Sequence, residues 1–215
     1  MRRLVGPVAV VAALWLVGLA FASGATGECI CATARETNGW CPVHKLGYVG
    51  GAKITSDAAY ITADAHGHDL DLSKFTCPTC RAAIASNGFC ETDRIGFVDK
   101  KAYFSRLTYE LGRAEMRPAS SITCRTCRKN SESHGWCTKD GVGMVGPFAI
   151  RDRQGYDKAV AGLAILIVAD QAAPRCQHCV IAILTDSECP VCRIRYKDGK
   201  AASSNSAPAA AGTSR

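Results

Sequence analysis

Residues 77–93 read CPTCRAAIASNGFCETD and define a pattern that recurs along the chain. A Cys-x-x-Cys pair is followed by a nine-residue spacer, a third cysteine and, three residues further on, an aspartate. The pattern returns as CRTCRKNSESHGWCTKD at 124–140, as CQHCVIAILTDSECPVC at 176–192 and, with a Cys-x-Cys start, as CICATARETNGWCPVH at 29–44. These four sets take up all thirteen cysteines of the 215-residue chain, so we interpret it as four copies of one small unit.

Each set combines three cysteines with a fourth residue that can also bind a metal ion. That residue is a histidine in copy one, an aspartate in copies two and three, and a cysteine in copy four. Soft ligands at this spacing are typical of tetrahedral zinc sites, so the sequence predicts up to four zinc ions. The predicted ligands are Cys29, Cys31, Cys41 and His44 in copy one; Cys77, Cys80, Cys90 and Asp93 in copy two; Cys124, Cys127, Cys137 and Asp140 in copy three; and Cys176, Cys179, Cys189 and Cys192 in copy four.

Other fates for these thiols stay open. Copy four could hold two disulfides in an oxidising compartment, and copies two and three could each hold one disulfide and a free thiol. Each aspartate is either a true ligand or a cap of the following turn, with a water or substrate on the metal instead. Zinc binding contributes roughly 10–16 kcal/mol, against about 3 kcal/mol for a disulfide that closes a 15-residue loop, which favours metal. We expect ligands to pair within a copy rather than across to the next, because a longer loop costs more entropy to close.

The repeat extends beyond the cysteines and predicts a common local structure. In the first three copies a glycine and an aromatic residue stand directly before the third cysteine, and Asn or His precedes the glycine. Asn-Gly favours a hairpin turn, so we expect the nine-residue spacer to form a short hairpin. Six residues after the third cysteine, Gly47, Gly96 or Gly143 is followed by an apolar residue and a valine, which indicates a short strand.

A helix is expected after this strand in each of the first three copies. The clearest pattern covers 99–116, where Tyr103, Leu107 and Leu111 recur at four-residue steps and would share one apolar face. Residues 156–172 are apolar on nearly every side, which predicts the most buried helix of the chain. The corresponding pattern in copy one is weaker, and copy four has none, as expected of a truncated terminal repeat.

The predicted fold class is a small α+β array of four tandem Cys-rich zinc-knuckle modules, built from hairpin knuckles and a short strand, with a helix in each of the first three. Units of about 50 residues bury too little apolar surface to be stable without a staple such as a metal ion. The weaker helical pattern of copy one predicts a helix over residues 56–65. The predicted units are 1–25, a signal peptide or N-terminal anchor helix; 26–74, 75–121 and 122–173, repeats one to three; 174–198, the truncated fourth repeat; and 199–215, a disordered tail.

The N-terminus predicts export. The basic start MRR precedes an apolar run over 4–22, and AFA at 20–22 fits a signal-peptidase site. An uncleaved anchor is the alternative, because the run approaches the shortest length that spans a bilayer. In either case the cysteines are expected in the periplasm or elsewhere outside the inner membrane, with membrane contact only through this segment.

CPTC at 77–80 with Cys90, and CQHC at 176–179 with CPVC at 189–192, resemble the zinc knuckles of zinc-ribbon and treble-clef proteins. The resemblance concerns the architecture of the metal site and covers most of residues 28–196. It implies backbone N–H groups wrapped around the thiolates in a knuckle turn. It also implies that the metal ion has a structural role.

These patterns favour a binding protein over an enzyme. The net charge of +7 is spread along the chain and gives no nucleic-acid footprint, and no phosphate loop or Ser-His-Asp order is present. The leading hypothesis is an exported zinc-binding protein with structural ions whose modules bind an envelope protein. The alternatives are a protein that buffers zinc or copper or delivers it to a metal-exchange partner, and a thiol–disulfide oxidoreductase. The Cys-x-x-Cys pairs lack the surrounding βαβ unit that the redox alternative would need.

Overall fold

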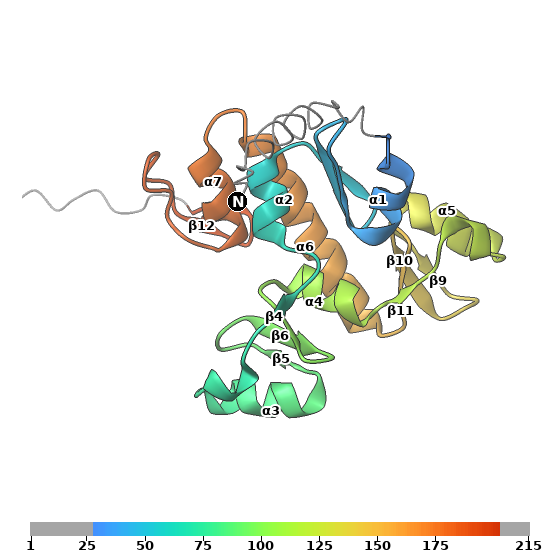
Figure 1. Ribbon diagram of the computed structural model, residues 1–215, viewed down its shortest axis with the longest axis horizontal. Helices are drawn as coiled ribbons and strands as arrows, with labels where there is room; N and C mark the ends of the chain where they lie inside the picture. The colour runs from blue at the N-terminus through green and yellow to red at the C-terminus, as the bar shows by residue number, and fades with distance from the viewer. Residues whose placement is uncertain (1–27, 203–215) are drawn as a thin grey trace, which may run out of the picture.

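The computed structural model describes residues 28–202, and in this range the chain is a small α+β protein with antiparallel sheets. The longest described helix, α6 (Arg153–Ala172), runs through the middle, with α2 (Asp57–Ala63) and α4 (Arg106–Arg113) packed beside it (Figure 1). The predicted signal or anchor, 1–25, lies outside the described residues. Among the helices of residues 28–202, none has the length and apolar character needed to cross a bilayer.

The first three copies share one plan, in which a helix is followed by a short strand, a tight turn, and a hairpin of two longer strands. The helix, the short strand and the hairpin strands are α1 (Cys31–Thr37), β1 (Trp40–Cys41), β2 (Leu46–Val49) and β3 (Ala52–Ile54) in copy one; α3 (Pro78–Ser86), β5 (Phe89–Cys90), β6 (Ile95–Val98) and β7 (Lys101–Tyr103) in copy two; and α5 (Arg125–Ser133), β9 (Trp136–Cys137), β10 (Val142–Val145) and β11 (Phe148–Ile150) in copy three. Each hairpin leads into α2, α4 or α6 in turn. Each of these three copies therefore contains the cysteine site, a first helix, a three-stranded sheet and a second helix.

Each of the first two copies lends a strand to the next one. The strands β4 (His68–Asp69) and β8 (Glu115–Met116) follow α2 and α4, and they pair with β7 and β11. The sheets of copies two and three thus have the order β4-β7-β6-β5 and β8-β11-β10-β9. Two short 3₁₀ turns, η1 (Leu72–Lys74) and η2 (Ala119–Ser121), then lead to the next cysteine pair.

Copy four is shorter but follows the same plan. It consists of α7 (Gln177–Leu184) and a hairpin of β12 (Tyr196–Lys197) with β13 (Lys200–Ala201), and no second helix follows in the described residues. The segment from 199, predicted as a tail, thus begins with a paired strand. Its residues 203–215 lie outside the described part of the chain.

The hairpin predicted for the nine-residue spacer is wrong, because the spacer forms α1, α3 or α5. The helix ends where Asn38, Asn87 or His134 adopts the left-handed conformation, with φ of 56°, 51° and 56°. The next N–H then returns to the helix, as Gly39 donates to the carbonyl of Ala34 at 2.7 Å. Asn-Gly here marks a helix C-terminus, which needs the same left-handed residue as a hairpin turn.

The residue that ends this helix also fastens it to the hairpin. Its side chain accepts a hydrogen bond from a backbone N–H in the turn after the longer strand. The four bonds run from Gly50 to Asn38 (2.7 Å), from Asp99 to Asn87 (3.2 Å), from Gly146 to His134 (3.2 Å) and from Asp198 to Asp186 (2.8 Å). Asp186 shows that copy four closes in the same way without the Asn-Gly signal.

A tyrosine in the second helix explains why each of the first three copies has a glycine six residues after its third cysteine. The rings of Tyr60, Tyr109 and Tyr156 cover Gly47, Gly96 and Gly143, where any Cβ would overlap the ring. Each tyrosine hydroxyl donates to the carbonyl of the residue that ends the first helix, at 3.0, 3.0 and 2.8 Å. The aromatic residue before the third cysteine packs on the same ring, with centroids 5.2–5.5 Å apart. One tyrosine therefore joins both helices and the sheet of its copy.

The helix predicted over 99–116 is shorter than expected. Ser105 begins α4 by accepting the N–H of Thr108 at 3.1 Å, so Tyr103 lies on β7 while Leu107 and Leu111 are buried on the helix. The expectations of a helix within 56–65 and over 156–172 are confirmed by α2 and α6. The latter is not buried on every side, because Val168 remains 43% exposed.

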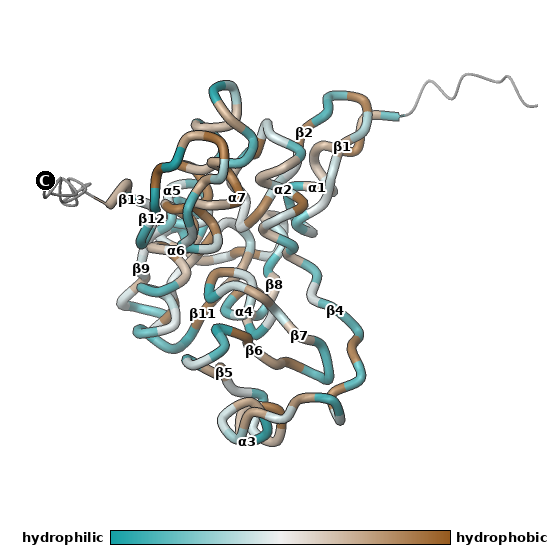
Figure 2. The backbone as a smooth tube through the Cα atoms, turned by 90° about the vertical axis from the view of Figure 1, so that its left-hand side faces the viewer, coloured by the Kyte–Doolittle hydropathy of each residue, from teal (hydrophilic) through white to brown (hydrophobic). Residues whose placement is uncertain are grey.

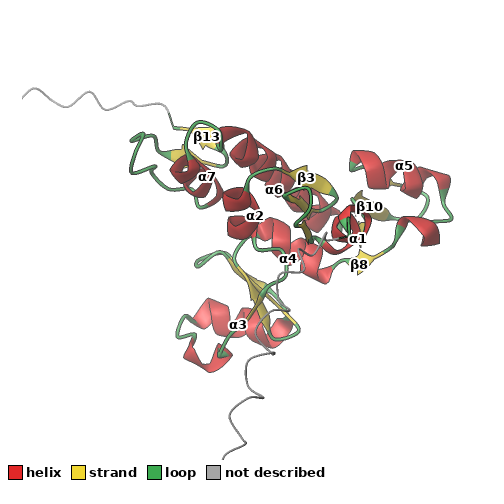
Figure 3. Ribbon diagram, turned by 45° about the horizontal axis from the view of Figure 1, so that its top comes forward, coloured by secondary structure: helices red, strands yellow, loops and turns green. Residues whose placement is uncertain are grey.

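The main core lies where the second helices meet α7. Leu107 of α4, Leu163 and Leu166 of α6, and Val180 and Ile183 of α7 are all buried in it. Figure 3 shows three arms that extend from this centre and carry α3, α5 and β13, and α7 packs on α6 at the base of the third arm. In Figure 2 the α3 end of copy two lies away from α6 and α7.

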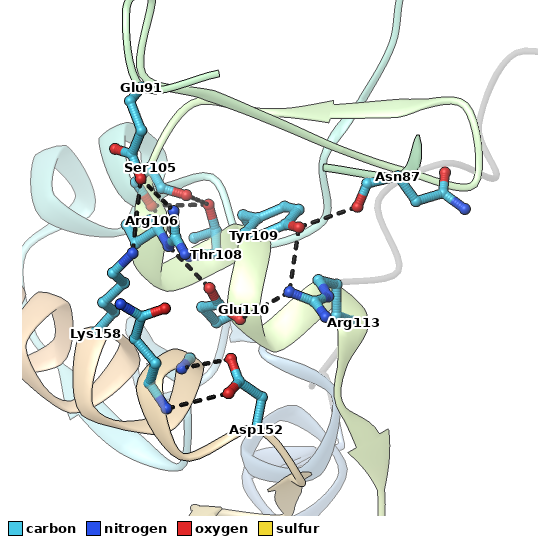
Figure 4. Close-up of polar contacts among 12 residues, drawn as sticks. Asn87, Glu91, Ser105, Arg106, Thr108, Tyr109, Glu110, Arg113, Asp152 and Lys158 are labelled. Atoms are coloured by element: carbon cyan, nitrogen blue, oxygen red, sulfur yellow. Dashed lines mark hydrogen bonds and ion pairs between the residues drawn. The ribbon is translucent and has the colours of Figure 1, made fainter. Parts of the chain in front are cut away.

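Besides the buried Leu107 and Leu111 of α4, a polar network around this helix connects copy two to the centre (Figure 4). Glu110, only 1% exposed, accepts from Arg106 at 2.8 Å and lies 3.5 Å from Arg113. Glu91, beside the third cysteine of copy two, pairs with Arg106 at 2.9 Å and with Lys158 of α6 at 3.6 Å. These contacts orient copy two against α6 without embedding its sheet in the core.

Candidate metal centres

The structure brings together the four residues of every predicted set. In each set the four ligand atoms lie within 4.8 Å of one another, and each set lies within one copy, as the loop-closure argument predicted. Ligand sets that cross between copies are not formed. We number the sets by copy: centre 1 (Cys29, Cys31, Cys41, His44), centre 2 (Cys77, Cys80, Cys90, Asp93), centre 3 (Cys124, Cys127, Cys137, Asp140) and centre 4 (Cys176, Cys179, Cys189, Cys192).

Local structure positions these atoms before any ion binds. In copies two to four the first cysteine caps the spacer helix and the second lies in its first turn. The third cysteine stands at the end of a short strand, or in copy four at the corresponding bend, and the fourth ligand lies in the turn that follows. The residue after the fourth ligand is left-handed in all four copies: Lys45 (φ 50°), Arg94 (57°), Gly141 (62°) and Arg193 (57°). Only the second half of each site is a knuckle turn, so the expected pair of knuckles is wrong for the first half, which is a helix N-terminus.

Centre 1 has the spacing of a tetrahedral site. The Nδ1 atom of His44 lies 3.5, 3.3 and 3.6 Å from the Sγ atoms of Cys29, Cys31 and Cys41. A tetrahedral zinc with Zn–S of about 2.3 Å and Zn–N of about 2.0 Å places sulfur and nitrogen about 3.5 Å apart. The histidine therefore faces all three thiols at the separation that a shared ion requires.

The sulfur separations in centres 3 and 4 also fit a shared ion. Cys124 and Cys137 lie 3.9 Å apart, and Cys176 and Cys189 lie 3.8 Å apart. Two thiolates on one zinc ion are separated by about 3.8 Å, whereas a disulfide bond is about 2.05 Å long. All thirteen cysteines of the chain are free thiols in this arrangement.

The aspartates of centres 2 and 3 belong to the cluster of ligand atoms. The Oδ2 atom of Asp93 lies 3.1 Å from Sγ of Cys80, and that of Asp140 lies 3.0 Å from Sγ of Cys127. These hydrogen bonds from the thiols lower the pKa of both carboxyl groups. Each aspartate is thus an ionised oxygen donor that faces the cysteines of its own copy.

The knuckle turn favours the thiolate form of the third cysteine. The backbone N–H of His44 is the main cause of the lowered pKa of Cys41, about 6. Burial opposes ionisation of Cys90, but the Thr79 hydroxyl and backbone N–H groups outweigh it and lower its pKa to about 7. Burial is likewise outweighed at Cys189, where the N–H of the fourth ligand helps to lower the pKa to about 7. Thiolate is the form that binds metal, so the implied wrapping of N–H groups around sulfur is present here.

The sequence suggests Arg81 and Arg128 either as counter-charges to the ligands or as ordinary surface residues, but their bonds to the backbone, and the role of Thr79, appear only in the structure. Arg81 and Arg128 directly follow the second cysteine and donate to the carbonyl groups of Phe75 and Ile122, at 3.1 and 2.9 Å. These bonds hold the chain just before the first cysteine of centres 2 and 3. The Thr79 hydroxyl lies 2.9 and 3.1 Å from the sulfurs of the first and third cysteines. The only sequence signal for these hydrogen bonds is that an arginine directly follows the second cysteine in copies two and three. The same pattern is also expected of ordinary charged residues on the surface.

The donor chemistry of all four sets fits a tetrahedral divalent ion. Each set offers four ligand atoms, which is the number that closes a structural site, and such sites are built from thiolate with imidazole or carboxylate. Outer-shell hydrogen bonds of the kind found here orient the ligands and strengthen binding. The chain is therefore a cysteine-rich repeat protein with four groups that could each hold a metal ion.

Comparison of the chain with protein-family models, curated proteins and solved structures finds no match. The class of the protein thus rests on its repeated sites and on the fold that presents them. The particular role of those sites is a matter for proposal.

Proposed function

We propose that this chain is an exported zinc-binding repeat protein whose four ions stabilise its modules. One observation carries the proposal: the small separate clusters of copies two, three and four each include two buried cysteines of the candidate site. Copy four's own cluster contains Cys179, Ala182 and Cys189 as its buried members, and two of the six buried residues in the copy-three cluster are cysteines. Such interiors supply little hydrophobic stabilisation.

An ion at each centre would replace the missing core. It would connect the N-terminus of the spacer helix to the knuckle turn, which are the two halves of every module. Zinc binding by sites of this type contributes roughly 10–16 kcal/mol at neutral pH, more than a core of a few small residues can give. This magnitude supports a structural role for the metal.

The role in the cell follows from the surface and the N-terminus. The apolar run over 4–22 supports export to the periplasm, with retention at the inner membrane as the alternative. The exposed apolar side chains Ile61 (72%) and Val191 (63%) are available for contact with another envelope protein. We therefore propose a protein-interaction module with metal-built arms.

Native mass spectrometry of protein purified without added metal tests the proposal. We expect four zinc ions per chain, and loss of amide protection in the arms when the ions are removed. Cys189→Ser should lose one ion and unfold copy four, whereas His178→Ala, an exposed change between two ligands of the same centre, should keep four. A chain without metal whose mass is lowered by pairs of hydrogens would contradict the proposal and favour disulfides.

A metal-buffering or delivery role is the second candidate. It is favoured by the exposure of the fourth ligand in every centre, namely His44, Asp93, Asp140 and Cys192. An ion can be approached from solvent at that position. The two roles differ in one result: for a carrier, ions leave while the arms keep their amide protection.

A further inference from the structure

Centres 2, 3 and 4 form a natural series that differs in one ligand. All three use a Cys-x-x-Cys pair at a helix N-terminus, a nine-residue spacer and a third cysteine in a knuckle turn. The fourth ligand is a carboxylate in centres 2 and 3 and a thiol in centre 4. Differences in metal retention within this series therefore report on the fourth ligand.

A carboxylate is the weaker ligand for a soft or borderline ion in such a set. Thiolates suit zinc and copper(I), whereas carboxylate oxygens suit harder ions such as magnesium or calcium. Asp93 and Asp140 are also exposed, so a carboxylate that leaves the ion is at once solvated. The cost of detaching the fourth ligand is thus lowest in centres 2 and 3.

The aspartate centres have a bonding arrangement that competes with metal. The carboxylate of Asp93 accepts from the Cys80 thiol at 3.1 Å, and that of Asp140 accepts from Cys127 at 3.0 Å. An ion with Zn–S of about 2.3 Å and Zn–O of about 2.1 Å would hold sulfur and oxygen about 3.6 Å apart. The shorter separations are those of a charge-assisted hydrogen bond, which partly satisfies both groups once an ion has left.

At the fourth ligand, centres 1 and 4 have no carboxylate that could accept a charge-assisted hydrogen bond from a thiol. His44 sits at tetrahedral distances, 3.3–3.6 Å, from all three sulfurs of centre 1. In centre 4 the fourth ligand is Cys192, whose backbone N–H donates to the sulfur of Cys189 at 3.3 Å. Its own side chain is a thiol, and sulfur is a weaker hydrogen-bond acceptor than a carboxylate oxygen. Loss of an ion from these centres therefore cannot be offset by a thiol–carboxylate hydrogen bond of the kind that centres 2 and 3 form.

We propose that centres 2 and 3 are an exchangeable pair of divalent-ion sites, and that centres 1 and 4 retain their ions. This inference rests on the proposed zinc binding and specifies which ions can pass to a chelating acceptor. The protein then has two classes of site on one scaffold. The fourth ligand, Asp93 in centre 2 and Asp140 in centre 3, makes these two centres exchangeable.

The test is a chelator titration of the zinc-loaded full chain with EDTA, followed by native mass spectrometry. We expect two ions to leave first and two to leave at a chelator concentration at least about tenfold higher, the range that changes in ligand support produce. The double variant Asp93→Cys/Asp140→Cys should keep all four ions through the first step. Cys192→Asp, the reverse change, should lose three ions in the first step.

Asp157→Cys is the control for an added thiol, because Asp157 lies on α6 and its side chain is 56% exposed. It should leave the two-step titration unchanged. Release of all four ions in one step, or a double variant that loses two ions as readily as the unmodified chain, would overturn the proposal. If the double variant does not fold, Cys192→Asp decides the matter alone. A chain that binds no zinc at all would instead overturn the proposed function.

Discussion

Copies two and three carry the same ligands but are attached to the molecule in different ways. In copy three Val145, Phe148 and Ile150 of the hairpin are buried in the main core. In copy two the hairpin residues Phe97 and Ala102 belong to a separate small cluster around its own cysteines. An identical site can thus hold together part of the central core or a separate arm.

Copy two packs on the core through its second helix, α4, whose Leu107 and Leu111 are buried there, whereas the contacts of its sheet and knuckle with other copies are mostly ionic. Glu91 bridges to Lys158 of α6, and Arg94 pairs with Asp186 of copy four at 2.6 Å. Exposed pairs of this kind contribute only about 0–1 kcal/mol each. The part of copy two that comprises α3 and its sheet should therefore be able to open while α4, α6 and the rest of the core stay folded.

The largest expected difference is between Cys137→Ser and Cys90→Ser. Loss of a centre removes roughly 10–16 kcal/mol of binding, as large as the whole stability of a typical domain. Cys137→Ser should lower the main unfolding transition, because its hairpin is part of the core. Cys90→Ser should abolish amide protection in α3, β5 and β6 but leave α6 protected, as hydrogen exchange will show. Equal loss of α6 protection in both variants would contradict the comparison.

Core truncations sharpen the same contrast without touching a ligand. Phe97→Ala in copy two and Leu163→Ala in α6 remove side chains that are 1% and 2% exposed. Each should cost about 2–5 kcal/mol where it acts. We expect the urea midpoint of the main transition to fall for Leu163→Ala, while Phe97→Ala chiefly raises exchange in copy two. A shift of the main midpoint by Phe97→Ala as large as that of Leu163→Ala would show that copy two is part of one cooperative unit.

Arg117 lies beside centre 3, and centre 2 has no arginine at the corresponding position. It directly follows β8 and lines a cavity of about 350 Å³ with Cys124, Cys127 and Asp140, whereas Leu70 follows β4 at the matching place in copy two. The pKa of Arg117 is raised mainly by Glu115 and further by Cys127 and Asp140, so its charge helps to offset the anionic ligands.

Arg117→Leu should therefore weaken zinc binding at centre 3 towards the affinity of centre 2, by less than the roughly tenfold gap that separates the two classes of site. Leu70→Arg should act in the opposite direction at centre 2. Chelator midpoints of the two variants measure both effects. An unchanged midpoint for centre 3 in Arg117→Leu would assign the arginine to its ion pair with Glu115 alone.

The smallest expected effects come from the tyrosine hydroxyls. Tyr156→Phe and Tyr109→Phe each remove one hydrogen bond to the residue that ends the spacer helix. A bond of this kind contributes about 0.5–1.5 kcal/mol. Tyr156→Phe should lower the main urea midpoint slightly, and Tyr109→Phe should act on copy two only. A larger loss for either variant would mean that the ring, and not only its hydroxyl, had shifted.

The ligand sets could be predicted because they depend on short-range spacing. A Cys-x-x-Cys pair and a third cysteine ten positions further on can meet only if the spacer folds back, whatever its secondary structure. The spacer itself was mispredicted because Asn38 and Asn87 fit both a hairpin turn and a helix end, and the Ala-rich stretch between the cysteines of copy two favours a helix. Tyr103 matched the spacing of Leu107 and Leu111 but lies beyond the Ser105 cap, on a strand.

The sequence alone determined that the chain repeats four times and that each copy gathers one set of four ligand atoms. Only the tertiary structure decided that β4 and β8 complete the sheet of the following copy, and that the hairpin of copy three joins the core while the hairpin of copy two stays outside it. The physical reason is distance along the chain. Ligand grouping is settled within seventeen residues by local turns and caps, whereas the burial of Val145 or the exposure of copy two depends on packing against α4, α6 and α7 from other copies.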